Sequence, residues 1–403
     1  MTATTEKEVL DMPRIALVHD YFIQMGGAER VAEAMHCLFP DAPLYTTVAL
    51  PHRLTPGLRD AAIHTSWMQH LPGVETRFRH YFLLYPWAVE SLDLSAYDLI
   101  LSSSSGYGKG VHRRQGAVHV CYCHTPMRWV WRYDDYAARE EFSAWSRVAL
   151  SATLPGLRWW DQRAAQQPDY YLANSQVVAD RIRQHYGREA VVIPPPVEVD
   201  RFQTDHITDD YYLVLSRLIP YKRIDLAVEA CTRLGRPLVV IGDGPDRQRL
   251  ESMAGPQVEF LGRVSDATVR RFASRARALL FPGEEDFGLT PLEINAAGRP
   301  VIAFRAGGAL ETVIENVTGL FFDQPNADSL ASAIEEFELR SWHQPTLRRH
   351  AESFAYPVFA ARLLDFLQQV APASCLPQLR ALAGSFAAPQ HTTRETFSIA
   401  PVH

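Results

Sequence analysis

Short runs of β-branched and other apolar residues alternate with helical patterns along most of the chain. Each run is followed by a turn or loop and then by apolar residues at helical spacing, which is typical of parallel α/β sheets. The runs form two series, one on each side of the three prolines at 194–196. The pattern therefore predicts two doubly wound domains.

The first series predicts an N-terminal domain over residues 12–193. Its strands are expected at 14–19, 97–102, 118–122, 170–173 and 191–193. A glycine pair opens a helix expected over 28–39, and Asn174-Ser175 is a good N-cap for the helix after the fourth strand.

The second series predicts a C-terminal domain over 194–370. Its strands are expected at 211–216, 237–241, 258–261, 278–281 and 300–304, and its final helix at 358–370. Consecutive prolines cannot continue a sheet ladder and make a stiff connector, so the run at 194–196 marks the boundary. Two such domains imply a cleft with ligands at the carboxyl ends of the strands.

The two ends of the chain lack these patterns. Residues 1–11 are polar and acidic, and periodicity is lost from 371 to 403, so both segments are predicted to be poorly ordered. No run approaches the ~18 apolar residues of a membrane span, and the start lacks the apolar core of a secretory signal. We therefore expect a cytoplasmic protein.

Composition narrows the possible functions. The 403 residues carry a net charge of -6, which argues against nucleic-acid binding. Five cysteines, an odd number, suggest free thiols in a reducing compartment. Cys121, Cys123 and His124 could be a fragment of a metal site, but no second ligand pair follows at a zinc spacing. A buried strand is the favoured interpretation, and we expect no metal and no cofactor.

The segment 281–293 carries the most informative chemistry. Glu285 and Glu293 stand in a Glu-x7-Glu spacing within a strand, loop and helix. With Thr290 as N-cap and Pro291 in first position, Glu293 would complete a capping box, which is a purely structural role. A helix N-terminus at a strand end is also an anion site, because its free N–H groups point outward.

This segment, continued by 295–301 and by Gly307-Gly308, resembles the donor site of retaining GT-B glycosyltransferases of family 4. The resemblance covers about 13–370, and several motifs follow in the expected order. It implies two Rossmann-like domains facing across a cleft. The sequence departs from the family at Asp286, where a glycine is usual.

The resemblance assigns roles to this loop and helix. Glu285 would approach the hydroxyls of the transferred sugar. The backbone N–H groups of Phe287, Gly288 and Leu289 would point toward the sugar or the distal phosphate. Glu293 would bind both ribose hydroxyls, which suits a carboxylate that accepts two hydrogen bonds.

Basic residues of the second domain complete the implied donor site. Arg217 and Lys222 match the family's pair on the donor diphosphate, where fixed cations stabilise the charge of the leaving group in place of a metal. Gly242 lies in a family-like turn, and Arg263 would contact the nucleobase. The alternative is that the basic pair consists of solvated surface charges.

The first domain offers fewer candidates. Gly26 and Gly27 lie at a helix N-terminus, where backbone can approach a phosphate or an acceptor, although a lone glycine pair is a weak signal. His124 stands in a segment, 122–128, that resembles a subgroup of bacterial family 4 enzymes, many of them mannosyltransferases. It would act beside the reacting sugar, or else be a hydrogen-bonded core residue.

An aromatic and basic stretch at 76–88 allows two interpretations. It could contact a membrane surface, or form a buried helix, which the flanking Glu75 and Glu90 favour. If the acceptor is a polyprenyl-linked saccharide, this stretch and Trp67 are where contact is expected, at the inner face of the plasma membrane.

The resemblance implies an enzyme that moves mannose from GDP-mannose onto a saccharide or polyprenyl-diphosphate-linked saccharide in bacterial surface-polysaccharide synthesis. It implies retention of configuration without a covalent intermediate. Alternatives are a UDP-, dTDP- or ADP-sugar donor, a phosphorylase or epimerase, and a non-catalytic nucleotide-sugar-binding subunit. Two carboxylates could also suggest a glycosidase, but here both lie on one loop and helix.

Overall fold

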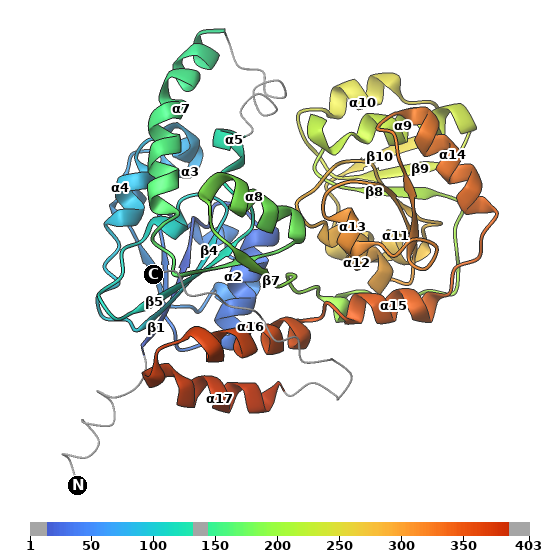
Figure 1. Cartoon of the computed structure of the whole chain (residues 1–403). Helices are drawn as coiled ribbons and strands as arrows, with labels where there is room; N and C mark the ends of the chain where they lie inside the picture. Colours follow the sequence, from blue (N-terminus) through green and yellow to red (C-terminus); the bar gives the residue numbers. More distant parts are fainter. Residues whose placement is uncertain (1–13, 132–143, 387–403) are drawn as a thin grey trace. The chain divides into compact units, whose positions relative to one another are not determined.

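The computed structural model describes residues 14–131 and 144–386 (Figure 1). The chain divides into unit 1, Met1–Pro194 with Pro357–His403, and unit 2, Pro195–Tyr356. The predicted N-terminal extension lies outside the described residues.

Unit 1 is built on a seven-stranded sheet of order β3-β2-β1-β4-β5-β6-β7, in which every pair is parallel. Its strands are β1 (Ile15–His19), β2 (Leu44–Thr46), β3 (Ile63–Thr65), β4 (Leu99–Ser104), β5 (Val118–Cys123), β6 (Tyr170–Ala173) and β7 (Ala190–Val192). The predicted strands are confirmed. The sequence pattern missed β2 and β3, which have three residues each and are too short to show periodicity.

Helices connect the strands of unit 1. They are α2 (Gly27–Leu38), α3 (Val74–Arg77), α4 (Tyr85–Glu90), α5 (Arg128–Trp131), α7 (Ala144–Ala164), α8 (Gln176–Tyr186), α16 (Tyr356–Val370) and α17 (Leu376–Ser385). The predicted cap of α8 is confirmed, because the Ser175 hydroxyl accepts the N–H of Val178 at 3.2 Å.

The C-terminal helix α16 packs in unit 1, and not in the C-terminal domain as predicted from the range 194–370. The ring of Phe359 lies 6.0 Å from that of Tyr122, and the ring of Phe366 lies 6.1 Å from that of Tyr170. Both partners belong to strands of the unit 1 sheet. The apolar face of α16 therefore packs on strands that precede it by more than 180 residues in the sequence.

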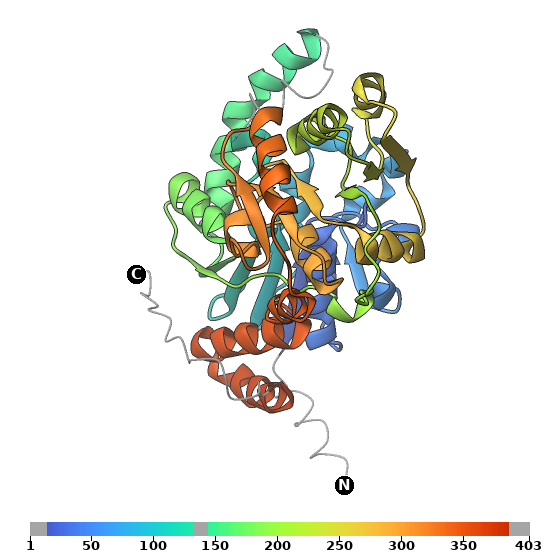
Figure 2. The same cartoon turned by 90° about the vertical axis from the view of Figure 1, so that its right-hand side faces the viewer.

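Helix α17 corrects the prediction of a poorly ordered tail over 371–403. It begins at Leu376, buries Leu379 completely, and follows the buried Cys375. The two helices α16 and α17 lie side by side in both views (Figure 1 and Figure 2). The helix was missed because its few apolar residues carry only a weak period. Residues 387–403 lie outside the described part.

Unit 2 has a six-stranded sheet of order β10-β9-β8-β11-β12-β13, again with parallel pairs throughout. Its strands are β8 (Tyr212–Leu215), β9 (Leu238–Ile241), β10 (Val258–Gly262), β11 (Leu279–Phe281), β12 (Val301–Phe304) and β13 (Gly319–Phe322). The predicted strands are confirmed, and β13 is an additional edge strand.

Seven α-helices are described in unit 2, and the doubly wound α/β architecture predicted from the sequence is present in both units. The helices are α9 (Ile224–Leu234), α10 (Arg247–Met253), α11 (Asp266–Arg275), α12 (Leu289–Ala296), α13 (Ala309–Thr312), α14 (Ala327–Glu338) and α15 (Gln344–Glu352).

The strand orders define where each unit can bind a ligand. The order reverses between β1 and β4 in unit 1 and between β8 and β11 in unit 2. In open α/β sheets, ligands bind outside the carboxyl ends of the strands at such a reversal. None of the helices in the described ranges combines the length and apolar character needed to cross a membrane.

Candidate active site

Two predicted residues meet at the β8/β11 reversal of unit 2. Lys222 ends a short 3-10 helix (Pro220–Lys222) after β8, and Glu285 lies in the loop after β11. The Lys222 ammonium donates to Glu285 Oε1, with the two side chains 13% and 21% exposed. The pair is thus partly shielded from water yet open to a ligand.

Arg217 and Arg223 flank Lys222 in different ways. Arg217 is exposed at the end of β8, and no ion pair of its guanidinium occurs within the described ranges. Arg223 has a φ of 51°, which is costly for a residue with a side chain, and its guanidinium bonds to Asp225 at 3.2 Å. The turn that presents Lys222 is therefore strained and braced by an ion pair.

The start of α12 differs from the predicted capping box. The N-cap is Gly288, with a φ of 86°, and the helix begins at Leu289, so Thr290 is inside it and Glu293 lies too far along to cap. Glycine adopts this left-handed angle without penalty, which lets the helix begin two residues early. Leu289 therefore lies in the first turn, whose N–H groups lack intrahelical partners.

Asp286, the departure from the family pattern, fits the loop without strain. The described residues other than glycine that have a positive φ are Arg223 and Asn316. Position 286 therefore has a backbone conformation open to any L-residue, and does not require glycine.

Glycines let the loops of unit 2 fit together. A Cβ on Gly308 would lie 2.2 Å from the Phe287 backbone, and the Gly308 N–H donates to the Glu285 carbonyl at 2.8 Å. A Cβ on Gly242, which has a φ of 136°, would lie 1.8 Å from the Ser216 carbonyl oxygen. Backbone packing at these glycines thus fixes the loops that carry the candidate residues.

Glu293 has a basic neighbour that the sequence did not indicate. Its carboxylate, 12% exposed, lies 3.8 Å from the Arg201 guanidinium. Arg201 also pairs with Asp266 at 2.9 Å. Because Arg201 and Glu293 are far apart in the sequence and share no motif, no local signal could have predicted their contact.

Arg263, the predicted nucleobase contact, follows β10 at the edge of the sheet. Its side chain is 80% exposed and lies 4.0 Å from the Asp243 carboxylate. The structure therefore leaves Arg263 loosely held, and its role stays a prediction.

His124 of unit 1 is fixed at the end of β5. Its N–H donates to the Ser104 carbonyl at 2.9 Å, and its carbonyl accepts from the Asn174 amide at 3.0 Å. Its ring Nε2 lies 2.8 Å from the Ser103 hydroxyl, and the residue is 8% exposed. Both the backbone and the ring of His124 are thus held in place.

Asp20, directly after β1, is a buried carboxylate that sequence reasoning missed. It accepts hydrogen bonds from the Ser104 hydroxyl at 2.9 Å, the Ser105 N–H at 2.7 Å and the Gly108 N–H at 2.5 Å. These bonds tie the loop after β4 to the end of β1. An acidic residue directly after a buried strand was the available signal.

Gly26 is the N-cap of α2, at the helix start predicted from the glycine pair. However, its N–H already donates to the Glu29 carboxylate at 2.9 Å. An anion at Gly26 or Gly27 would have to compete with this carboxylate. The phosphate contact at Gly26 and Gly27 stays a prediction, and the Glu29 carboxylate would compete with the phosphate for the Gly26 N–H.

The stretch 76–88 is not one helix but parts of α3 and α4 joined by a 3-10 turn. Tyr85 is buried in the core of unit 1. Leu83 and Trp87 are 42% and 62% exposed, and Trp67 is 43% exposed. The structure thus buries one part of the stretch and exposes another, and membrane contact stays a prediction.

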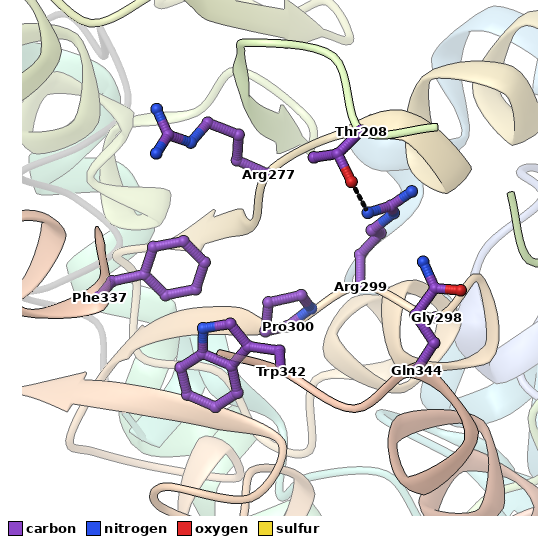
Figure 3. A pocket seen from close by; sticks show the side chains of 8 residues that line it. All are labelled: Thr208, Arg277, Gly298, Arg299, Pro300, Phe337, Trp342 and Gln344. Atoms are coloured by element: carbon purple, nitrogen blue, oxygen red, sulfur yellow. Dashed lines mark hydrogen bonds between the residues drawn. The ribbon is translucent and has the colours of Figure 1, made fainter. Parts of the chain in front are cut away.

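A cavity of about 240 Å³ lies in unit 2, away from these residues (Figure 3). It is lined by Thr208, Arg277, Gly298, Arg299, Pro300, Phe337, Trp342 and Gln344. Arg277 and Pro300 precede β11 and β12, so the cavity is at the amino ends of the strands. The Arg299 guanidinium donates to Thr208 at 2.5 Å and to two carbonyls, and Arg277 pairs with Asp210 at 2.9 Å. Both cations that line this cavity are therefore already engaged.

Two family models match the chain. The model described as Glycosyltransferase Family 4 matches residues 25–201, and the model described as Glycosyl transferases group 1 matches residues 197–355. The boundary between them falls at the start of unit 2.

Relatives in sequence include mannosyltransferases. A GDP-mannose-dependent alpha-(1-6)-phosphatidylinositol monomannoside mannosyltransferase of Mycobacterium tuberculosis is 29% identical over 277 residues, which is 58% of this chain and 72% of the relative. Alpha-1,3/1,6-mannosyltransferase ALG2 of Rhizomucor pusillus is 35% identical over 125 residues, 30% of this chain and 27% of the relative.

Solved structures share the fold. Anabaena Alr3699/HepE in complex with UDP superimposes with a TM-score of 0.66 at 16% identity, covering 89% of this chain and 100% of that one. Sucrose-phosphate synthase of Thermosynechococcus elongatus gives a TM-score of 0.66 at 18% identity, over 89% and 99% of the two chains. Taken with the two doubly wound sheets and the family models, these likenesses show that the chain is a glycosyltransferase of the family 4-like GT-B class.

Proposed function

We propose that this glycosyltransferase moves mannose from GDP-mannose onto a saccharide acceptor with retention of the anomeric configuration. The observation that carries the proposal is the contact of Lys222 with Glu285 at the β8/β11 reversal, beside the N-terminus of α12. The activity for which the mycobacterial relative is named and the segment around His124 support mannose as the sugar.

The proposed chemistry begins with cleavage of the bond between the sugar C1 and the diphosphate oxygen. That oxygen gains negative charge, which Lys222 and Arg217 offset together with the N–H groups at the start of α12. The acceptor hydroxyl forms its bond to C1 on the same face, and its proton passes to the leaving diphosphate. Before this step, when the donor binds, Lys222 would exchange Glu285 for the diphosphate and free that carboxylate for the sugar hydroxyls.

The proposed acceptor is a saccharide carried on a lipid, in bacterial surface-polysaccharide synthesis. The mycobacterial relative is named for a lipid-linked acceptor, phosphatidylinositol monomannoside. In this chain, the exposed Trp67, Leu83 and Trp87 are the side chains suited to the interface between lipid and water. A polyprenyl-diphosphate-linked saccharide satisfies the same chemistry.

The first experiment is thermal unfolding with GDP, UDP, ADP or dTDP, each with and without EDTA. A ligand at 100 times its Kd stabilises the native state by about 2.7 kcal/mol, which raises Tm by several degrees. We expect GDP alone to raise Tm, to the same extent in EDTA. The substitution Lys222→Ala should abolish the rise, whereas Arg233→Ala, on the exposed face of α9, should leave it intact.

A rise with another nucleotide would keep the enzyme class and overturn the GDP-mannose assignment. No rise with any nucleotide would overturn the donor site itself. Turnover then separates the remaining alternatives. A non-catalytic subunit binds GDP-mannose without releasing GDP, and an epimerase changes the sugar without an acceptor. The transferase requires both substrates, and the anomeric signal of its product reports retention.

A further inference from the structure

A line of buried polar side chains runs below the carboxyl edge of the unit 1 sheet. Strands β1 and β4 pair with His19 opposite Ser103. The His19 Nδ1 lies 3.0 Å from the Ser103 carbonyl oxygen and 3.1 Å from its hydroxyl, and the same hydroxyl lies 2.8 Å from His124 Nε2. On the far side, His19 Nε2 lies 4.0 Å from Glu29. Short contacts therefore connect His19, Ser103 and His124, whereas Glu29 lies beyond hydrogen-bond distance.

The chemistry of these groups determines which atom donates each hydrogen bond. A carbonyl oxygen can only accept, so the contact with the Ser103 carbonyl requires the hydrogen of His19 to be on Nδ1. The Ser103 hydroxyl oxygen lies 3.1 Å from the same nitrogen and can accept this hydrogen as well. The remaining short contact of that hydroxyl is His124 Nε2, which lets Ser103 donate its own hydrogen there. In a neutral ring, His124 then carries its hydrogen on Nδ1.

We infer that Ser103 and His19 are positioning residues that hold His124 in the tautomer with hydrogen on Nδ1. In this form the Nδ1 side of the ring can only donate a hydrogen bond, and the ring orientation is set by Ser103. Glu29, whose carboxylate accepts the Gly26 N–H, lies 4.0 Å from His19 Nε2, which is beyond hydrogen-bond distance and therefore does not require a hydrogen on that nitrogen. The consequence for transfer rests on the proposed function: His124 would offer an N–H to an oxygen of the sugar or the acceptor.

The same sheet contains a matched control. One residue earlier on β4, the Ser102 hydroxyl lies 2.8 Å from His119 Nε2, and both residues are fully buried. Successive side chains of a strand point to opposite faces of the sheet, so Ser102 does not share the face of Ser103. Ser102→Ala thus removes an identical bond from the same strand without touching His124.

The direct test is long-range 1H–15N NMR of histidine side chains in the full chain without ligand, at a pH where His124 is neutral. His124→Gln assigns the signal. We expect the native His124 to show a protonated Nδ1, Ser103→Ala to shift it toward the Nε2-protonated form, and Ser102→Ala to leave it unchanged. If Ser103→Ala does not fold, Ser103→Cys keeps the size and weakens the donor. A native His124 protonated on Nε2, or one insensitive to Ser103, overturns the inference.

The kinetic test uses GDP-mannose and an acceptor. Loss of one positioning hydrogen bond should lower kcat about tenfold in Ser103→Ala, with the donor KM changed less than about threefold. Ser102→Ala should keep the native kcat. An equal loss in both variants would mean general destabilisation, and would overturn the positioning role. Because the NMR experiment needs no donor, a failed donor assignment would leave the tautomer result standing.

Discussion

The carboxyl edges of the two sheets hold their candidate residues by different means. In unit 1, buried side chains form the hydrogen bonds: Asp20 accepts four, two of them from backbone N–H groups, and Ser103 connects two histidines. In unit 2, the edge is made of backbone loops that meet at glycines such as Gly242 and Gly308. The partly exposed Lys222 pairs with Glu285 at this edge.

The difference suggests different tasks for the two edges. A buried network of this kind is rigid, because breaking any bond leaves a polar group unsatisfied. A glycine-lined edge instead brings N–H groups and mobile charges close to a polyanionic ligand. Unit 1 is therefore suited to holding a fixed ring beside the reaction, and unit 2 to receiving a diphosphate.

The largest effect should follow from replacing Lys222 or Glu285, the charged pair of unit 2. Lys222→Ala should lower kcat by about 100- to 1,000-fold, because the cation that contacts the bound diphosphate also offsets the charge which the leaving group gains in the transition state. Glu285→Ala should also lower turnover strongly. Steady-state rates with GDP-mannose and an acceptor measure both changes. Neither variant should unfold, and Arg233→Ala serves as the control. Full activity in both Lys222→Ala and Glu285→Ala would show that the donor-site assignment is wrong.

A second large effect tests the rigidity of unit 1. The Lys109 ammonium, 2% exposed, lies 2.6 Å from Asp161, which is fully buried. Asp161 also accepts from the Trp131 indole and the Tyr186 hydroxyl. Replacing Lys109 by Met leaves a buried carboxylate without its cation, which costs about 3–5 kcal/mol of unfolding free energy.

The measurement is urea unfolding followed by tryptophan fluorescence, which reports mainly unit 1 because Trp342 is the only tryptophan of unit 2. The control is Arg183→Met, which breaks an ion pair with Glu189 whose side chains are 56% and 76% exposed. That loss should be about 0–1 kcal/mol. Equal losses in the two variants would contradict the description of unit 1 as a rigid buried network.

Gly242→Ala tests the backbone packing of unit 2. The added Cβ would lie 1.8 Å from the Ser216 carbonyl oxygen at a φ of 136°, so the backbone must move, at a cost of about 3 kcal/mol. Gly235→Ala is the control, because Gly235 also has a positive φ, 63°, but nothing lies within 4 Å of its added Cβ. It should cost about 1–2 kcal/mol. Thermal unfolding with and without GDP should show that only Gly242→Ala loses the ligand-induced rise.

Much of the fold could be predicted because each long apolar run is also a strand of a parallel sheet whose central strands are buried. The exceptions have physical reasons. Strands β2 and β3 are too short to display a period, and helix α16 was assigned to the wrong unit because a pattern does not specify its packing partner. The capping box at Thr290 was wrong because sequence gives residue types, whereas the start of α12 depends on the left-handed angle of Gly288.

The candidate site was predictable only where topology alone brings residues together. Lys222 and Glu285 follow adjacent strands, so their meeting follows from the order of the sheet. The contact of His19 with Ser103 depends on the register of two parallel strands, and that of Arg201 with Glu293 on the packing of a loop. Neither register nor loop packing is encoded in a local motif.

The smallest effect concerns His119, which contacts Ser102 in the same way as His124 contacts Ser103. Burial, and secondarily the charge of Arg113, lower the pKa of His119 to about 3. The unfolded chain, with an ordinary histidine pKa of about 6.5, therefore binds a proton first as the pH falls. The native state does not, so the unfolding free energy should fall by about 1.4 kcal/mol per pH unit below about 6.5 until the pH approaches the folded-state pKa.

His119→Gln should flatten this slope by about 1.4 kcal/mol per pH unit when urea unfolding is measured between about pH 4.5 and 6. Burial also lowers the pKa of His36 and His350, so the native slope contains other contributions, which cancel in the comparison with the variant. If the two slopes coincide, His119 is hydrated or protonated in the native state, and the interior around it is less dry than its complete burial implies. A flattened slope would instead support a neutral, dry environment for His119, on the face of the sheet opposite Ser103.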